Sequence, residues 1–344
     1  MPKSMPPPFV IPIFIAHQGC PHQCLFCNQR SITGAPEGMV GAREVEETIR
    51  TQLAWPRRYP DAPVQVAFYG GSFTGLTMER QRELLGAAQP FLASGQVREL
   101  RLSTRPDYVT SEIAGFLREH GVGIVELGAQ SLDDRVLAAS GRGHTAAQVR
   151  TAVACLKGAR IKVGLQLMLG LPGDSTATAL ASGRAAAALG PDMVRLYPCL
   201  VISGSPLAEL YHQGRYQPLS LSRAVALAGR LWSIFNGQGI SVVRMGLQPS
   251  ASLEETMLAG PYHPAFGELV LSRLFFNQVR AELSVRSPQQ AHCLCLAKAD
   301  ESIYRGKGNA NVKRLVALGL LEGVETVFSA SQPRQSVVLN PVDS

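Results

Sequence analysis

Short runs of apolar and β-branched residues recur along the first two thirds of the chain, separated by segments with helical periodicity. Residues 43–54, for example, place Val45, Ile49 and Leu53 on one face of a helix, and Thr77 is suited to cap the helix that follows it. Strands that alternate with helices imply right-handed crossovers and a parallel sheet. We interpret six runs as strands: residues 9–16, 64–70, 97–104, 123–129, 161–169 and 192–201.

The six repeats predict an α/β fold in which a partial (β/α)6 barrel is followed by a smaller α+β C-terminal extension. The pattern changes after about residue 204, where helices dominate, and further strands are predicted at "GISVVRM", "TVFSA" and "SVVLNP". The active sites of such sheets lie at the C-terminal ends of the strands. We expect a core barrel over residues 1–205, a helical continuation over residues 206–285, and a small α+β unit over residues 286–344.

Composition and charge narrow the classes of protein. Of the 344 residues, 46% are hydrophobic, and 33 basic against 26 acidic residues give a net charge of +7. That balance favours a polyanionic partner such as nucleic acid, although many proteins of this size are simply basic. The apolar run at residues 6–16 is too short and too rich in proline to span a bilayer, and it lacks a cleavage pattern, so we expect a cytoplasmic protein.

Three of the seven cysteines, Cys20, Cys24 and Cys27, lie within the segment "GCPHQCLFCNQ" with the spacing C-x3-C-x2-C. A closed structural metal site needs four ligands, whereas three thiolates on a [4Fe–4S] cluster leave one iron open for catalysis. Such a cluster of cysteines indicates metal or redox chemistry in a reducing compartment rather than a disulfide framework. From the spacing alone, a zinc knuckle is an alternative.

Two features in and after this cysteine loop make the chain similar to a known family. The residue before the third cysteine is aromatic, Phe26, and "FYGGSF" at the end of the second predicted strand offers the bare backbone of Gly70 and Gly71 and the hydroxyl of Ser72. In these respects the chain resembles the radical SAM superfamily, whose signature is C-x3-C-x-aromatic-C. The resemblance implies a radical SAM barrel with a [4Fe–4S] cluster, whose fourth iron binds the amino and carboxylate groups of S-adenosylmethionine (SAM).

Further segments match in order along residues 9–217, namely "STRPDY", "ELGAQSLDD", "GRGHT", "GLPGD" and "RLYPCLVISGSPLAELYHQGRY". Together they resemble the radical SAM half of the Elongator catalytic subunit, a tRNA uridine-modifying enzyme, and more loosely oxygen-independent coproporphyrinogen oxidase. The resemblance implies Gln130 and Arg142 as contacts to the SAM ribose and carboxylate, and it places Ser103 where both relatives favour glutamate. The full implied set is Cys20, Cys24 and Cys27 at the cluster, and Phe26, Gly70, Gly71, Ser72, Ser103, Arg105, Gln130, Arg142 and Gln166 at SAM.

The reaction that the resemblance implies is reductive cleavage of SAM to methionine and a 5′-deoxyadenosyl radical, with a donor such as ferredoxin or flavodoxin as partner. It also suggests tRNA as the substrate. The residues after 206 contain no glycine-rich loop that would bind a CoA pyrophosphate, so acetyl-CoA chemistry is not expected. Two alternatives are a small-molecule or tetrapyrrole-type radical SAM enzyme and, in another class, a non-enzymatic iron–sulfur or zinc-binding module. No catalytic residue is assigned.

The C-terminal region holds two further candidates. In "RGKGNANVKRLVALG", a basic loop precedes a helix, so Lys307, Lys313 and Arg314 are candidate RNA contacts, although a plain loop-to-helix junction is the favoured interpretation of the segment. In "HCLC", His292, Cys293 and Cys295 offer ligands for a second metal, but a strand with two buried thiols is the better interpretation. Cys155 and Cys199 are expected to be small core residues.

Overall fold

The computed structural model describes residues 6–15, 17–20, 24–28, 40–286 and 290–342. The chain forms two compact units. The first comprises Met1–Ala224 with Leu231–Tyr262, and the second comprises Val225–Arg230 with His263–Ser344. Within the described residues, no helix combines the length and the apolar character that crossing a membrane requires.

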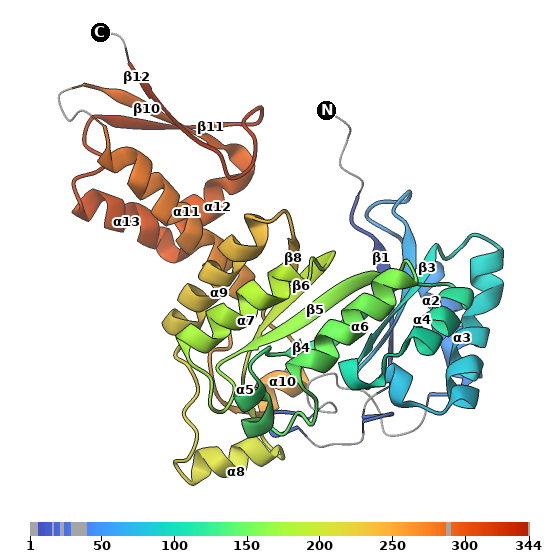
Figure 1. The fold of residues 1–344 in the computed structure, drawn as a ribbon. Helices are drawn as coiled ribbons and strands as arrows, with labels where there is room; N and C mark the ends of the chain where they lie inside the picture. The colour runs from blue at the N-terminus through green and yellow to red at the C-terminus, as the bar shows by residue number, and fades with distance from the viewer. Residues whose placement is uncertain (1–5, 16, 21–23, 29–39, 287–289, 343–344) are drawn as a thin grey trace. The chain divides into compact units, whose positions relative to one another are not determined.

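The first unit is built on one parallel sheet, drawn in Figure 1. Its strand order, β1-β2-β3-β4-β5-β6-β8, follows the chain, so each crossover leads to the neighbouring strand and the sheet curls into a half barrel. All six predicted strands are present, and the seventh, β8, comes from "GISVVRM" and pairs in parallel with β6. The strands are β1 (Phe9–Phe14), β2 (Val64–Tyr69), β3 (Glu99–Thr104), β4 (Val122–Gln130), β5 (Lys162–Leu169), β6 (Met193–Pro198) and β8 (Ser241–Met245). The predicted fold class is therefore confirmed, with one strand more than expected.

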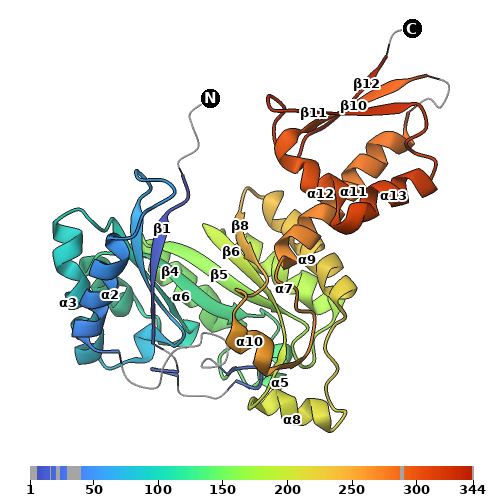
Figure 2. The same cartoon turned by 180° about the vertical axis from the view of Figure 1, so that it is seen from behind.

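The crossover helices of this unit cover one face of the sheet, as the two opposite views show (Figures 1 and 2). Helix α2 buries Val45 and Ile49, as the periodicity predicts, and Thr77 caps α3 by accepting a hydrogen bond from the backbone N–H of Arg80 at 3.3 Å. The helices are α2 (Ala42–Leu53), α3 (Met78–Ala93), α4 (Ser111–Glu119), α5 (Asp134–Ala139), α6 (Ala146–Gly158), α7 (Thr176–Ala188), α8 (Pro206–His212) and α10 (Ala251–Thr256). The short strands β7 (Val201–Ile202) and β9 (Met257–Ala259) pair with each other, and α9 (Leu221–Asn236) includes residues of both units.

The second unit is a small α+β structure, and it includes residues 263–285 as well as the expected 286–344. Its sheet has the order β11-β10-β12, in which β10 runs parallel to β11 and antiparallel to β12. The elements are α11 (Phe266–Ser284), β10 (His292–Ala297), α12 (Glu301–Arg305), α13 (Ala310–Ala317), β11 (Val324–Ser329) and β12 (Val337–Pro341). Leu294 and Leu296 of β10 pack with Phe275 and Phe276 of α11 in its core.

The four cysteines outside the cysteine loop were expected to lie in the core. Cys199 is buried, as expected, but Cys155, Cys293 and Cys295 are only half-buried. Strand β10 does contain "HCLC", and its alternation turns Leu294 inward and both thiols to the opposite face, with their Sγ atoms 3.6 Å apart. The interpretation as a strand is confirmed, and the burial of its thiols is wrong because the sheet leaves that face uncovered.

Candidate active site

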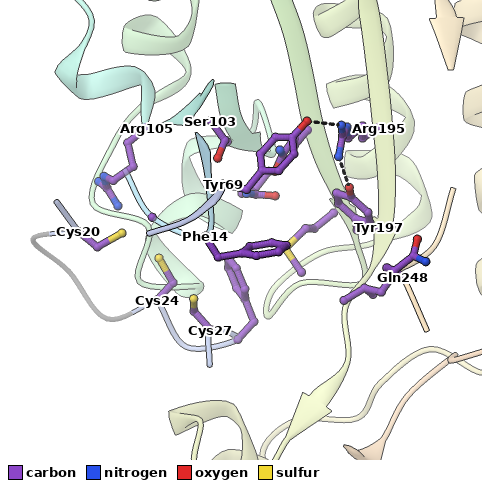
Figure 3. A pocket seen from close by; sticks show the side chains of 18 of the residues that line it. Phe14, Cys20, Cys24, Cys27, Tyr69, Ser103, Arg105, Arg195, Tyr197 and Gln248 are labelled. Atoms are coloured by element: carbon purple, nitrogen blue, oxygen red, sulfur yellow. Dashed lines mark hydrogen bonds between the residues drawn. The ribbon is translucent and has the colours of Figure 1, made fainter. Parts of the chain in front are cut away.

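A cavity of about 750 Å³ lies in the first unit, where the parallel strands end. Phe14, Tyr69, Gln130 and Tyr197 stand at or beside the C-terminal ends of four of these strands, and all four line the cavity. Figure 3 shows this region, with the three cysteines on one side and Arg195, Tyr197 and Gln248 on the other. The position is the one at which open α/β sheets bind their ligands.

The cysteine loop follows β1 and forms one wall of the cavity. Cys20, Cys24 and Cys27 all line it, and the Nη1 of Arg142 donates a hydrogen bond to the Sγ of Cys24 at 3.1 Å. Phe26 lines the cavity as well and packs with Cys24 in a buried hydrophobic cluster. No three His, Cys, Asp or Glu side chains of the described residues converge on a single metal ion. A cubane cluster does not need such convergence, because each thiolate binds a different iron.

Glycines allow the cysteine loop to lie close to the end of β2. A Cβ atom on Gly71 would stand 2.5 Å from the backbone oxygens of both Ile15 and Gln18, and one on Gly19 would stand 2.1 Å from the oxygen of Ser72. The missing side chain of Gly71 therefore makes room for the chain that leads to Cys20, rather than for a ligand. Gly70, with φ of 89°, accepts a hydrogen bond from the backbone N–H of His17.

The cavity walls hold buried polar atoms without a hydrogen-bond partner in the described residues. Those that also lack an ion-pair contact are the Nη1 of Arg105, the Oε1 of Gln130 and the Nε of Arg142. Gln130 also has a positive φ of 64°, a backbone conformation that non-glycine residues adopt mainly under constraint. Unpaired buried polar groups are costly, so these atoms fit a ligand with charged and hydroxyl groups of the kind that SAM carries.

The remaining predicted SAM contacts differ in whether they line the cavity. Ser103 and Gln166 line the cavity, whereas Ser72 is fully buried and does not. The Oγ of Ser72 lies 3.0 Å from the Oγ1 of Thr104 and accepts a hydrogen bond from the backbone N–H of Arg105. Ser72 thus acts on the shape of the wall through its neighbours.

The opposite wall consists of residues that sequence reasoning did not single out. It is formed by Tyr69, Arg195, Tyr197, Arg244 and Gln248, and we call it the arginine wall. Arg195 donates to the hydroxyl of Tyr69 at 3.1 Å and to the hydroxyl of Tyr197 at 3.2 Å, as the dashed lines in Figure 3 show. The alternation in "RLYP", which turns both polar side chains to one face of a strand, was an available signal.

One buried carboxylate organises this wall. Glu126 forms ion pairs with Arg101 at 2.7 Å and with Arg195 at 2.5 Å, and it accepts a hydrogen bond from the hydroxyl of Tyr69 at 2.9 Å. Gly164 on the next strand leaves it space, since a Cβ there would stand 3.0 Å from the Cγ of Glu126. Burial, and next the charge of Glu126, raise the pKa of Tyr69, so this hydroxyl stays protonated and remains a donor.

His144, two residues after Arg142, is buried, and its Nε2 is 3.2 Å from the backbone oxygen of Ala129. Burial, and next the positive charges of Arg142 and Arg105, lower the pKa of His144 to about 3. The ring is therefore neutral at physiological pH and can donate Nε2–H to that oxygen. The neutral ring adds no further positive charge beside Arg105 and Arg142.

The candidate RNA contacts belong to the second unit and do not line the cavity. Lys307, Lys313 and Arg314 are exposed, and the guanidinium of Arg314 lies 4.7 Å from the centre of the Phe276 ring. Lys307 precedes α13 in a short 3₁₀ turn, and Lys313 and Arg314 lie within that helix. The structure thus brings the cofactor candidates together and leaves the RNA candidates as a separate surface.

Comparison with known proteins supports the resemblance. The family model of the radical SAM superfamily matches residues 14–181, and that of the radical SAM C-terminal domain matches residues 191–275. An uncharacterised protein of Methanocaldococcus jannaschii is 28% identical over 227 residues, which is 64% of this chain and 69% of that protein. A tRNA uridine(34) acetyltransferase of Methanocaldococcus infernus is 26% identical over 262 residues, and the match covers 65% of this chain and 49% of that enzyme.

Among solved structures, the archaeal Elp3 of Methanocaldococcus infernus, lacking residues 1–46, superposes with a TM-score of 0.60 at 21% identity. The superposition covers 83% of this chain and 65% of that one, and it shows a shared fold. The chain spans about half the length of the acetyltransferase that it matches. With both family models matching in order around one cavity that holds the three cysteines, this chain belongs to the radical SAM superfamily, whose enzymes use a [4Fe–4S] cluster and SAM.

Proposed function

We propose that this protein binds a [4Fe–4S] cluster through Cys20, Cys24 and Cys27, cleaves SAM reductively, and acts on tRNA. The observation that carries the proposal is one cavity in which three thiols face unpartnered buried atoms of Arg105, Gln130 and Arg142. When bound, the cluster supplies one electron that converts SAM to methionine and a 5′-deoxyadenosyl radical. A donor such as ferredoxin or flavodoxin would provide that electron in the cytoplasm.

The roles of the residues follow from their contacts. Arg142 donates a hydrogen bond to the Sγ of Cys24, and its Nε remains available to a carboxylate in the cavity. Arg105 is held by Asp107 at 2.8 Å, which fixes the guanidinium while its Nη1 stays unpaired. We assign these groups, with Gln130, Ser103, Gln166 and the backbone beside Gly70 and Gly71, to SAM binding. Phe26 closes the wall by packing, and its apolar contact excludes water from the thiols.

The tRNA substrate is supported by a relative that is named a tRNA uridine(34) acetyltransferase and by the net charge of +7. It is supported also by the three exposed basic side chains of Lys307, Lys313 and Arg314. Each of them that neutralises a phosphate would release counterions, so tRNA affinity should fall steeply with salt.

The activity is tested by incubating the reduced, reconstituted protein with SAM and bulk tRNA under anaerobic conditions. We expect tRNA to increase 5′-deoxyadenosine formation and to yield a nucleoside of altered mass, and a Cys24→Ala variant should do neither. Cleavage of SAM that tRNA neither stimulates nor couples to a new nucleoside would contradict the choice of tRNA, and it would favour a small-molecule substrate.

The RNA surface is tested by a salt series of tRNA affinities for the native protein and a Lys307/Lys313/Arg314 triple-alanine variant. Each lost contact should flatten the slope of log affinity against log salt by about one unit. The matched control replaces three exposed arginines of the first unit, Arg98, Arg118 and Arg150, with alanine. Equal slopes for the native protein and the first variant would remove these residues from the interface.

A further inference from the structure

The arginine wall carries more positive charge than its surroundings balance. Arg195 of β6 and Arg244 of β8 are direct neighbours across the parallel pair, so their side chains lie on the same face, and both line the cavity. Like charges in such positions repel each other. The described residues that line the cavity include four arginines and neither an aspartate nor a glutamate.

The buried carboxylate behind this wall is already shared. Glu126 compensates Arg101 and Arg195, which together carry one more charge than it does. Arg244 has no carboxylate within ion-pair distance in the described part of the chain, and its one hydrogen-bond partner there is the side-chain oxygen of Gln248. The guanidinium of Arg244 therefore faces the cavity with its charge unbalanced.

The neighbouring polar groups are oriented as donors. The hydroxyl of Tyr197 accepts a hydrogen bond from Arg195, which leaves its own proton for a ligand. The amide of Gln248 accepts from Arg244 through its oxygen, which turns its NH₂ group outward as a further donor. Tyr197 and Gln248 lie across the cavity from the cysteines in Figure 3. Arg244, which donates to Gln248 and lines the same cavity, adds a cationic donor to these two neutral ones.

We propose that Arg244, Tyr197 and Gln248 form a subsite for an anionic group of the substrate, either a phosphate or a carboxylate. A guanidinium with two neutral donors matches the several acceptor oxygens of either group. If the substrate is a nucleotide within tRNA, as proposed above, the anion is its phosphate. If the substrate is a small acid, the anion is its carboxylate. The subsite rests on the proposed function, because it would bind part of the substrate of that reaction, but it does not require that the substrate is tRNA.

The test uses calorimetric binding to the anaerobically reconstituted, SAM-loaded protein with three probes: uridine 5′-monophosphate, uridine and malonate. We expect the monophosphate to bind at least tenfold more tightly than uridine, and Arg244→Gln to remove that difference, because a charge-assisted hydrogen bond is lost. Arg244→Lys should restore part of it. Arg223→Gln, which removes an exposed arginine that follows the cap of α9, should leave the preference unchanged.

The iron content of each variant is measured as a control. A content equal to that of the native protein shows that the variant is folded and holds its cluster. Malonate binding that depends on Arg244, without any preference for the monophosphate over uridine, would keep the subsite and contradict the tRNA assignment. If Arg244→Gln bound both the monophosphate and malonate as tightly as the native protein, the subsite itself would be refuted.

Discussion

The two walls of the cavity are built on the same sheet but differ in how their polar groups are partnered. The cysteine wall, formed by the cysteine loop with Arg105, Gln130 and Arg142, leaves buried polar atoms without partners. In the arginine wall, Arg195 forms an ion pair with Glu126 and holds the hydroxyls of Tyr69 and Tyr197, while Arg244 has no carboxylate partner among the described residues. The first wall therefore leaves buried atoms for a ligand, whereas Arg195 in the second is held by contacts within the protein. We propose that this difference separates a cofactor site from a substrate site in a single cavity.

The largest effect is expected from crowding the cysteine wall at Gly71. In Gly71→Ala the new Cβ would stand 2.5 Å from the oxygens of Ile15 and Gln18, so the backbone leading to Cys20 must move. We expect loss of SAM cleavage, measured as 5′-deoxyadenosine formed by the reduced protein without substrate. Gly86→Ala is the matched control, because a Cβ there meets no atom within 4 Å. Full activity of the Gly71 variant would show that the wall does not depend on this close approach.

A second prediction concerns the order of the arginine wall. Replacing Glu126 with glutamine leaves Arg101 and Arg195 buried without their counterion, and breaking a buried pair in this way costs about 3–5 kcal/mol. The measurement is the free energy of unfolding in urea. Glu46→Gln, which breaks an exposed helical pair with Arg50, should cost less than about 0.5 kcal/mol. Equal effects of the two changes would mean that Glu126 does not organise the wall.

Near neutral pH, the smallest effect is expected from the protonation of His144, which lies two residues after Arg142. Its pKa is about 3 in the folded protein and near 6.5 in the unfolded chain, so the unfolded chain binds more protons between these values. Stability contributed by the neutral ring is present above pH 6.5 and is lost as the pH falls below it, by up to ~1.4 kcal/mol per pH unit.

In His144→Gln this part of the pH dependence of the unfolding free energy should disappear. His212→Gln, which removes an exposed histidine, should retain the native slope. Should the His144 variant keep that slope as well, the ring would be charged in the folded protein, and the electrostatic picture of the cysteine wall would need revision.

Local sequence could predict those parts of the site that are formed by residues close together in the chain. The cysteine spacing, Phe26, the Gly70–Gly71 pair and the six strands are local patterns, and all of them lead to one cavity. The pairing of Arg195 with Arg244 depends on the register between two strands that 42 residues separate. No periodicity reveals such a register, which is why the arginine wall emerged only from the structure.

The glycine motif is a second case in which the sequence does not reveal the contacts of a residue. The sequence marks Gly71 as a position that needs a bare backbone, but it does not say which atoms come close. The structure identifies them as the backbone of Ile15 and Gln18. Likewise, Ser72 was expected at SAM because it follows the glycines, yet its side chain turns toward Thr104 and away from the cavity.

The most direct test of the account is the iron content and SAM cleavage of the native protein beside a Cys20/Cys24/Cys27 triple-alanine variant, with Cys155→Ala as the control. After anaerobic reconstitution, the native protein and the control should hold about four irons per chain, as a [4Fe–4S] cluster requires, and should form 5′-deoxyadenosine when reduced. The triple variant should hold no cluster and form none. A full cluster in the triple variant, or a native protein that binds only zinc, would contradict the central claim.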